Sequence, residues 1–180
     1  MAINTTPEGF CDHRSVVADN ELHKFYSDLL RNADTMLFGR KTFQLLEAYW
    51  PEVAKNKTGT KEDIEFAELS TDIHKIVFSK NGIKTNWKNT TVLNEINPAE
   101  IRRWKEKQGK DMLVGSPSIV DQLIKLGLID EYYFQVQPMV GGSGKRFFEK
   151  EKLETPAKLI LHDAKFLKSG VIALCYRSGN

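Results

Sequence analysis

Short apolar runs and longer periodic segments alternate along the chain, and this pattern predicts strands that alternate with helices. A short run rich in Val, Ile, Leu and Phe is typical of a buried strand, whereas apolar residues spaced i, i+3, i+4 and i+7 indicate a helix. We predict strands at residues 2–6, 35–38, 75–78, 90–93, 111–114, 129–136, 158–162 and 171–176.

Capping residues and breakers mark the predicted helices. The first covers residues 22–33, with Asp19 or Asn20 as its N-cap, and the second begins near Thr42 and stops at Pro51. Residues 53–63 are polar and rich in lysine, so we expect a surface loop there, either a solvated excursion or a flap over a site. The remaining predicted helices are a short one at about 64–69, one opened by Asn97-Pro98 and one opened by Ser116-Pro117 and ended by Gly127.

The order of these elements predicts an α/β fold. Strands that alternate with helices form a mainly parallel sheet with right-handed crossovers. The last two strands flank Lys168-Ser169-Gly170, so they are expected to form an antiparallel hairpin at one edge of a mixed sheet. A length of 180 residues without a linker or repeat predicts one domain, residues 1–180.

The composition argues against some classes of partner but does not identify a function. The formal net charge is +2, which gives no reason to expect nucleic acid or a membrane surface as a partner. Cys11 and Cys175 have no metal-ligand spacing, so we expect two reduced thiols and no metal site. The absence of a signal pattern and of a long apolar run leads us to expect a cytoplasmic protein.

Candidate chemistry lies where three predicted parallel strands end. The first of these strands runs into Gly39-Arg40-Lys41-Thr42, the second into Ser79-Lys80, and the third into Gly115-Ser116. Ligands in open α/β sheets bind beyond the carboxyl ends of the strands, and helix N-termini together with cations suit phosphate. Any one of these residues alone is better explained as a surface or turn residue, but their convergence favours a phosphorylated dinucleotide such as NADPH.

These residues also resemble a known family. Gly39-Arg40-Lys41-Thr42-Phe43 is similar to the Gly-Arg-x-Thr-aromatic element of dihydrofolate reductases and of the riboflavin-biosynthesis reductases, the RibD C-terminal family. The segment from Gly127 to Glu131, followed by residues 138–144 and 146–148, resembles the most specific run of the riboflavin branch. The resemblance implies a three-layer dihydrofolate reductase-like fold, with a mostly parallel mixed sheet, and reduction of a heterocycle by NADPH.

The resemblance also assigns roles to residues. It implies that Arg40, Ser79 and Lys80 meet the 2′-phosphate of NADPH, and that the pyrophosphate meets Lys41, Thr42 and the turn from Gly115 through Ser116 and Ser118 to Ile119. The nicotinamide is expected near residues 2–6 and Gly115. The family has a second glycine where this chain has Ser116, and aspartate where it has Glu8.

The residues around the expected substrate leave alternatives open. The position of the folate-binding carboxylate of many dihydrofolate reductases falls on His23, which is either a proton donor or a surface histidine. Glu8 is the other candidate acid. Tyr49 and Trp50 either wall a flat substrate or pack at the edge of the core.

Three functions therefore compete. The first is an NADPH-dependent reductase of a pyrimidine-like or pterin-like substrate, standing alone because the chain has no His-x-Glu and Pro-Cys-x-x-Cys deaminase signature. The second is dihydrofolate reduction, and the third is a non-catalytic dinucleotide-binding dimer. A homodimer, formed through residues 132–137 and the C-terminal hairpin, is expected by analogy with the family.

Overall fold

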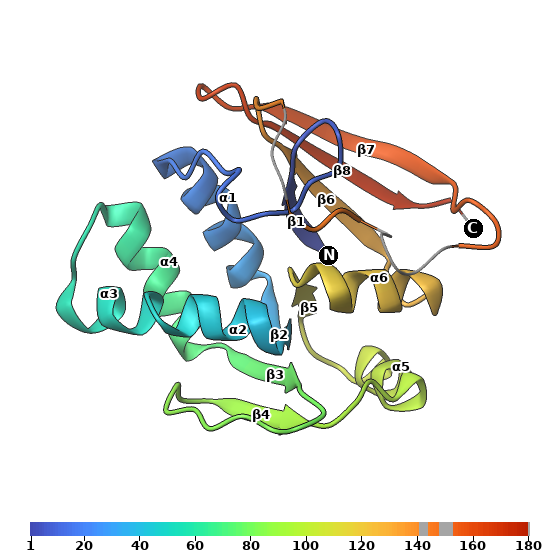
Figure 1. The fold of residues 1–180 in the computed structure, drawn as a ribbon, viewed down its shortest axis with the longest axis horizontal. Helices are drawn as coiled ribbons and strands as arrows, with labels where there is room; N and C mark the ends of the chain where they lie inside the picture. The colour runs from blue at the N-terminus through green and yellow to red at the C-terminus, as the bar shows by residue number, and fades with distance from the viewer. Residues whose placement is uncertain (141–143, 148–152, 180) are drawn as a thin grey trace. The chain divides into compact units, whose positions relative to one another are not determined.

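A computed structural model describes residues 1–140, 144–147 and 153–179 (Figure 1). Residues Met1–Ala18 and Pro117–Asn180 form one compact unit, and residues Asp19–Ser116 form a second. The single domain of residues 1–180 stays a prediction. Within the described residues, no helix has the length and apolar character needed to cross a membrane.

The second unit is built on an all-parallel sheet with the strand order β4-β3-β2-β5. Its strands are β2 (Ala33–Gly39), β3 (His74–Phe78), β4 (Thr90–Leu93) and β5 (Asp111–Val114). Leu37 of β2 lies opposite Ile76 on one side and Val114 on the other, and the central strands are apolar and largely buried. Because the strands are parallel, all their carboxyl ends lie along one edge of this sheet.

The helices of the second unit are α1 (Asn20–Arg31), α2 (Arg40–Glu47), α3 (Trp50–Asn56), α4 (Lys61–Asp72) and α5 (Pro98–Glu106). Two predicted caps are confirmed. The Asp19 side chain accepts a hydrogen bond from the backbone N–H of Leu22, and the Asn97 side chain accepts from those of Ala99 and Glu100. These caps satisfy backbone donors that have no partner inside the helix.

The predictions for residues 51–63 are wrong, and the helix predicted at 64–69 is present but longer than expected. Pro51 does not end a helix, because α2 stops at Glu47 and Pro51 lies in the first turn of α3, where a proline needs no N–H partner. Residues 53–63 are not a loop, since α3 and α4 take most of them. The short helix predicted at 64–69 is the middle of α4, which begins at Lys61 behind a capping box formed by Thr60 and Asp63.

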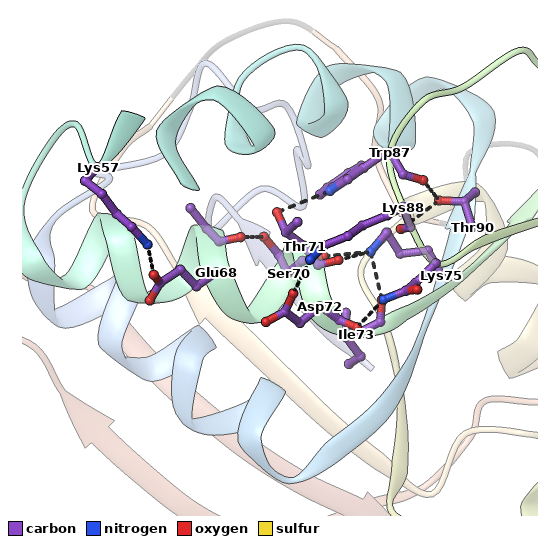
Figure 2. A network of polar contacts seen from close by, with 12 residues as sticks. Lys57, Glu68, Ser70, Thr71, Asp72, Ile73, Lys75, Trp87, Lys88 and Thr90 are labelled. Carbon is purple, nitrogen blue, oxygen red and sulfur yellow. Dashed lines mark hydrogen bonds and ion pairs between the residues drawn. The ribbon is translucent and has the colours of Figure 1, made fainter. Parts of the chain in front are cut away.

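The end of α4 is stabilised by a buried lysine from the following strand. The Nζ atom of Lys75 donates to the carbonyl oxygens of Ser70, Thr71 and Ile73 at 3.0, 2.9 and 2.8 Å. Figure 2 shows this ammonium group beside the ring of Trp87, whose centroid lies 4.8 Å away. A cation at a helix C-terminus satisfies the last carbonyls and complements the helix dipole, so Lys75 acts as the C-terminal cap of α4.

The first unit contains a mixed sheet with the strand order β1-β6-β8-β7 and the helix α6 (Pro117–Lys125). The strands are β1 (Ala2–Thr5), β6 (Glu131–Val136), β7 (Leu159–Phe166) and β8 (Ile172–Ser178). Strands β1 and β6 are parallel, whereas β8 pairs antiparallel with both β6 and β7. The predicted C-terminal hairpin and the α/β class are therefore confirmed. The glycine-rich residues 141–143 and Phe148 lie outside the described residues.

Candidate functional site

Three of the predicted site segments lie at the same edge of the parallel sheet. Strands β3 and β5 both pair with β2, and Gly39 at the end of β2 lies opposite Phe78, one residue before Ser79. Adjacent strands are about 4.8 Å apart, so the segments that leave β2, β3 and β5 start as neighbours. The backbone N–H of Gly39 donates to Oγ of Ser116 at 2.9 Å, and this buried bond joins the ends of β2 and β5.

The first of these segments is the start of α2. Gly39 is its N-cap and supplies no side-chain acceptor, so the first N–H groups of the helix have no side-chain cap. Arg40 and Lys41 are exposed, and Thr42 is half-buried. Helix α2 therefore begins two residues earlier than predicted and places two cations in its first turn, an arrangement that suits an anion.

The second segment is a tight turn after β3. Ser79 is buried, its Oγ donates to the carbonyl oxygen of Gly82 at 2.9 Å, and the N–H of Gly82 donates back to the carbonyl oxygen of Ser79 at 3.0 Å. Gly82 has a φ of 65°, which glycine adopts without strain. The turn leaves Lys80 exposed at its corner, whereas the Ser79 hydroxyl has its donor bond within the turn.

Three predicted site residues belong to the first unit. Ser118 is exposed in the first turn of α6, and Ile119 beside it is buried in the core. Glu8 is exposed in the turn that follows β1, where the N–H of Gly9 donates to the carbonyl oxygen of Thr6 at 2.9 Å.

His23 is held by an acidic partner that the sequence analysis did not select. The Nδ1 atom of His23 lies 2.5 Å from Oδ1 of Asp63, and both side chains are largely buried. Burial raises the pKa of Asp63, but the hydrogen bonds from Thr60 and the nearby His23 outweigh it, so that the pKa lies below its usual range. The Thr60-x-x-Asp63 spacing of a capping box is present in the sequence and was the signal for this acid.

Aromatic rings surround His23 on two sides. The Trp50 ring meets the imidazole edge-on at 5.5 Å between centroids, and the Phe66 ring stacks on it at 6.1 Å. Trp50 also contacts Phe66 at 4.6 Å, so this tryptophan is a packing residue between α1, α3 and α4. Tyr49 lies against Trp50 at 4.9 Å but is 57% exposed, which leaves one of its faces available.

The comparisons with known proteins establish the family. The model of the RibD C-terminal domain matches residues 9–173, so the chain belongs to that family. The uncharacterised protein YyaP of Bacillus subtilis is 32% identical over 152 residues, which are 84% of this chain and 77% of YyaP. The predicted family is therefore confirmed.

Solved structures share the fold at low sequence identity. A proposed riboflavin biosynthesis protein from Shewanella sp. PV-4 is 16% identical, covers all of both chains and has a TM-score of 0.69. Dihydrofolate reductase from Enterococcus faecalis, in a complex with NADP(H), is 14% identical over 99% of this chain and 95% of its own, with a TM-score of 0.61. The dihydrofolate reductase-like fold class is thus confirmed, and family and fold together support an oxidoreductase.

The donor set of the second unit fits a phosphorylated cofactor better than a metal ion. Exposed cations and the uncapped start of α2 are ligands for anions. Within the described residues, no group of three His, Cys, Asp or Glu side chains gathers in a way that could hold a metal.

Proposed function

We propose that this protein is an NADPH-dependent reductase of a small pyrimidine-like or pterin-like heterocycle, similar to the reductase of riboflavin biosynthesis. The observation that carries the proposal is the shared edge of β2, β3 and β5, where Arg40, Lys41 and Lys80 accompany the N-terminus of α2. We further propose that residues 1–180 act as one dihydrofolate reductase-like domain in the cytoplasm. Two free cysteines accord with a reducing compartment.

Arg40, Ser79 and Lys80 are proposed to hold the 2′-phosphate end of the cofactor. The guanidinium and ammonium groups supply charge-assisted hydrogen bonds to the phosphate. The Ser79 hydroxyl already donates its hydrogen to Gly82 and can only accept a further hydrogen bond, so the two cations are expected to contribute most of the binding. Lys41, Thr42 and the turn from Gly115 to Ile119 are proposed for the pyrophosphate. Ser116 takes part chiefly through its backbone, because its hydroxyl already accepts the Gly39 N–H.

The reaction needs a hydride and a proton. NADPH, when bound, supplies the hydride to a C=N or carbonyl carbon. Of the two proposed acids, His23 has the more defined setting, because Asp63 at Nδ1 fixes its ring and leaves Nε2 to face away from that partner. Helix α1, which carries His23 in its first turn, precedes β2 directly and contacts it. Glu8 remains the alternative donor.

Tyr49 is the better candidate for a substrate wall. Its ring is mostly exposed and is supported from behind by Trp50, which is itself locked among His23 and Phe66. A rigid aromatic face of this kind stacks on flat heterocycles. Trp50 is proposed to orient Tyr49 and to line the substrate site with the part of its ring that remains accessible.

A thermal-shift panel tests the cofactor. We expect the melting temperature to rise with NADPH and to rise much less with NADH, and the difference to disappear in Arg40→Ala. Arg102→Ala is the matched control, since Arg102 is an exposed arginine on α5. If neither nucleotide shifts the wild-type protein, the proposed reductase function is wrong.

Two other functions stay open and are separated by turnover. Dihydrofolate reductase predicts oxidation of NADPH by dihydrofolate, and the E. faecalis structure shares that fold. A non-catalytic dinucleotide-binding dimer predicts a thermal shift with NADPH and no oxidation by any pterin, pyrimidine or ribosyl compound.

A homodimer is proposed for the mixed sheet, through the C-terminal hairpin alone, because β6, which contains most of residues 132–137, is already paired with β1 and β8. Strand β7 lies at its edge, and the side chains of Ile160, Leu161 and Phe166 are 56%, 54% and 77% exposed. An edge strand with exposed apolar residues readily pairs with another chain. Sedimentation velocity is expected to show a dimer that Phe166→Glu dissociates, and a monomeric wild-type protein would refute this part of the proposal.

A further inference from the structure

The connection between β3 and β4 is fastened to the far end of α2. The hydroxyl of Thr85 donates to a carboxylate oxygen of Glu47, the last residue of that helix. The same hydroxyl oxygen accepts the backbone N–H of Trp87 at 3.0 Å. One threonine side chain thus joins the connection to α2 and also shapes the connection itself.

Trp87 fixes the next part of this connection between two helices. Its side chain is buried, and its ring lies 5.4 Å from the Phe43 ring of α2 between centroids. On the other side, its Nε1 donates to Oγ1 of Thr71 in α4 at 3.3 Å, as Figure 2 shows. We call Thr85, Trp87 and Glu47 the latch.

The latch follows Lys80 along the chain, in the connection between β3 and β4. Lys80 is in the turn between β3 and the latch, with the end of β3 fixed on one side by its pairing with β2 and β4. Arg40 begins the same helix that Glu47 ends. Helix α2 is a rigid rod of two turns, so a bond at Glu47 constrains the segment that carries Lys80 relative to the helix that carries Arg40.

We propose that Thr85 is a positioning residue for cofactor selection: its bond to Glu47 holds Lys80 at the spacing from Arg40 at which both cations reach one phosphate group. The inference rests on the proposed use of NADPH and adds to it residues that touch no ligand. NADH lacks the 2′-phosphate, so its binding does not depend on this spacing. Loss of the latch should therefore lower the preference for NADPH rather than the affinity for both nucleotides.

The test measures dissociation constants for NADPH and NADH by the change in nucleotide fluorescence. Thr85→Val keeps the shape of the side chain and removes both hydrogen bonds. In this variant Lys80 is displaced from the 2′-phosphate but not removed, so its charge-assisted hydrogen bond should be weakened and not lost. We therefore expect the NADPH-to-NADH affinity ratio to fall about tenfold, with NADH affinity nearly unchanged. Glu47→Gln keeps an oxygen acceptor and should preserve most of the ratio.

A double-mutant cycle separates positioning from general destabilisation. If Thr85 acts through Lys80, then Thr85→Val should change the ratio little in a Lys80→Ala background. Lys88→Ala is the control, because Lys88 is an exposed lysine of the same connection that pairs with Asp72 on the α4 side.

The outcomes are distinguishable. Equal losses of NADPH and NADH affinity in Thr85→Val, or an undiminished effect in the Lys80→Ala background, would overturn the positioning role while leaving the cofactor proposal intact. Wild-type protein that binds neither nucleotide would overturn both. A ratio that falls in Thr85→Val and not in Lys88→Ala supports the latch.

Discussion

Replacement of Lys75 by methionine should destabilise the second unit strongly. Methionine fills a similar volume and keeps the apolar part of the side chain, so the substitution isolates the ammonium group. Lys75 is fully buried, and its Nζ holds three carbonyl oxygens at the end of α4. Without it, these acceptors lose their partner in a region that water reaches poorly.

The magnitude follows from two opposing contributions. Each of the three hydrogen bonds from the charged donor contributes about 1.5–3 kcal/mol, and the contact with the Trp87 ring about 1–2 kcal/mol. Against these stands the cost of burying an ammonium group, which is several kcal/mol. The difference gives a net loss of about 2–4 kcal/mol for Lys75→Met, or roughly 5–15 °C in melting temperature for a chain of this size.

Urea denaturation followed by circular dichroism measures this loss. The control is Lys88→Met, which removes a neighbouring lysine whose side chain is 60% exposed and pairs with the exposed Asp72. A surface ion pair contributes little, so the control should lose less than about 1 kcal/mol. Equal stability of Lys75→Met and wild type would refute the argument, because it would show that water or backbone adjustment satisfies the α4 carbonyls without the lysine.

Three further predictions concern the same unit. Burial lowers the pKa of Lys75 to about 8; Asp72 opposes this shift and Lys88 adds to it. Between about pH 8 and 10.5 the Lys75 side chain is therefore protonated in the unfolded chain and deprotonated in the folded chain. Stability of the wild type relative to Lys75→Met should therefore increase by about 3 kcal/mol over that range, and a constant difference would contradict the lowered pKa. Ser116→Ala should cost about 1 kcal/mol by leaving the Gly39 N–H without its buried acceptor, whereas the exposed Ser118→Ala should cost less than about 0.5 kcal/mol in the same urea titration. Thr60→Ala removes the cap of α4 and should cost about 1 kcal/mol, with the exposed Thr58→Ala as its control; equal stabilities of these two variants would show that the cap contributes nothing.

Elements with a strong local signal were predictable from the sequence. The central strands β2 and β3 of the parallel sheet contain continuous apolar runs that are buried, and Asp19 and Asn97 mark helix starts by side-chain chemistry that needs no tertiary information. Gly127 and Gly170 both have positive φ, as expected for a helix end and a hairpin turn.

Residues 51–63 show where this kind of inference fails. A proline after an apolar helix indicates a stop, but it is equally suited to the first turn of a new helix, and only the packing of α3 on α4 decides between the two. Glu52 and Lys55 of α3 and Lys61 of α4 are exposed on their helices, so polarity was mistaken for irregular structure. The partner of His23 was missed for the same reason, because Asp63 had been placed in a loop.

The sequence predicted which segments form the candidate cofactor site, but not which of their polar groups are available to a ligand. Sequence order alone placed Gly39, Ser79 and Gly115 after three parallel strands, and adjacent pairing of those strands brings them together. Which hydroxyls are available depends on hydrogen bonds that no local pattern encodes. Ser79 donates within its own turn, and Ser116 accepts from Gly39 rather than simply facing a ligand.

Ser116 also changes how the departure from the family pattern is understood. A glycine at this position would leave the Gly39 N–H to find another acceptor, whereas the serine supplies one and joins the end of β2 to the end of β5. The N–H groups that remain for a phosphate are those of the first turn of α2, and Gly39 offers them no competing side-chain cap. With Ser116 in place, we therefore expect the proposed phosphate contact to be made by the start of the helix that begins at Arg40, and cofactor affinity to depend most on the two exposed cations of that turn.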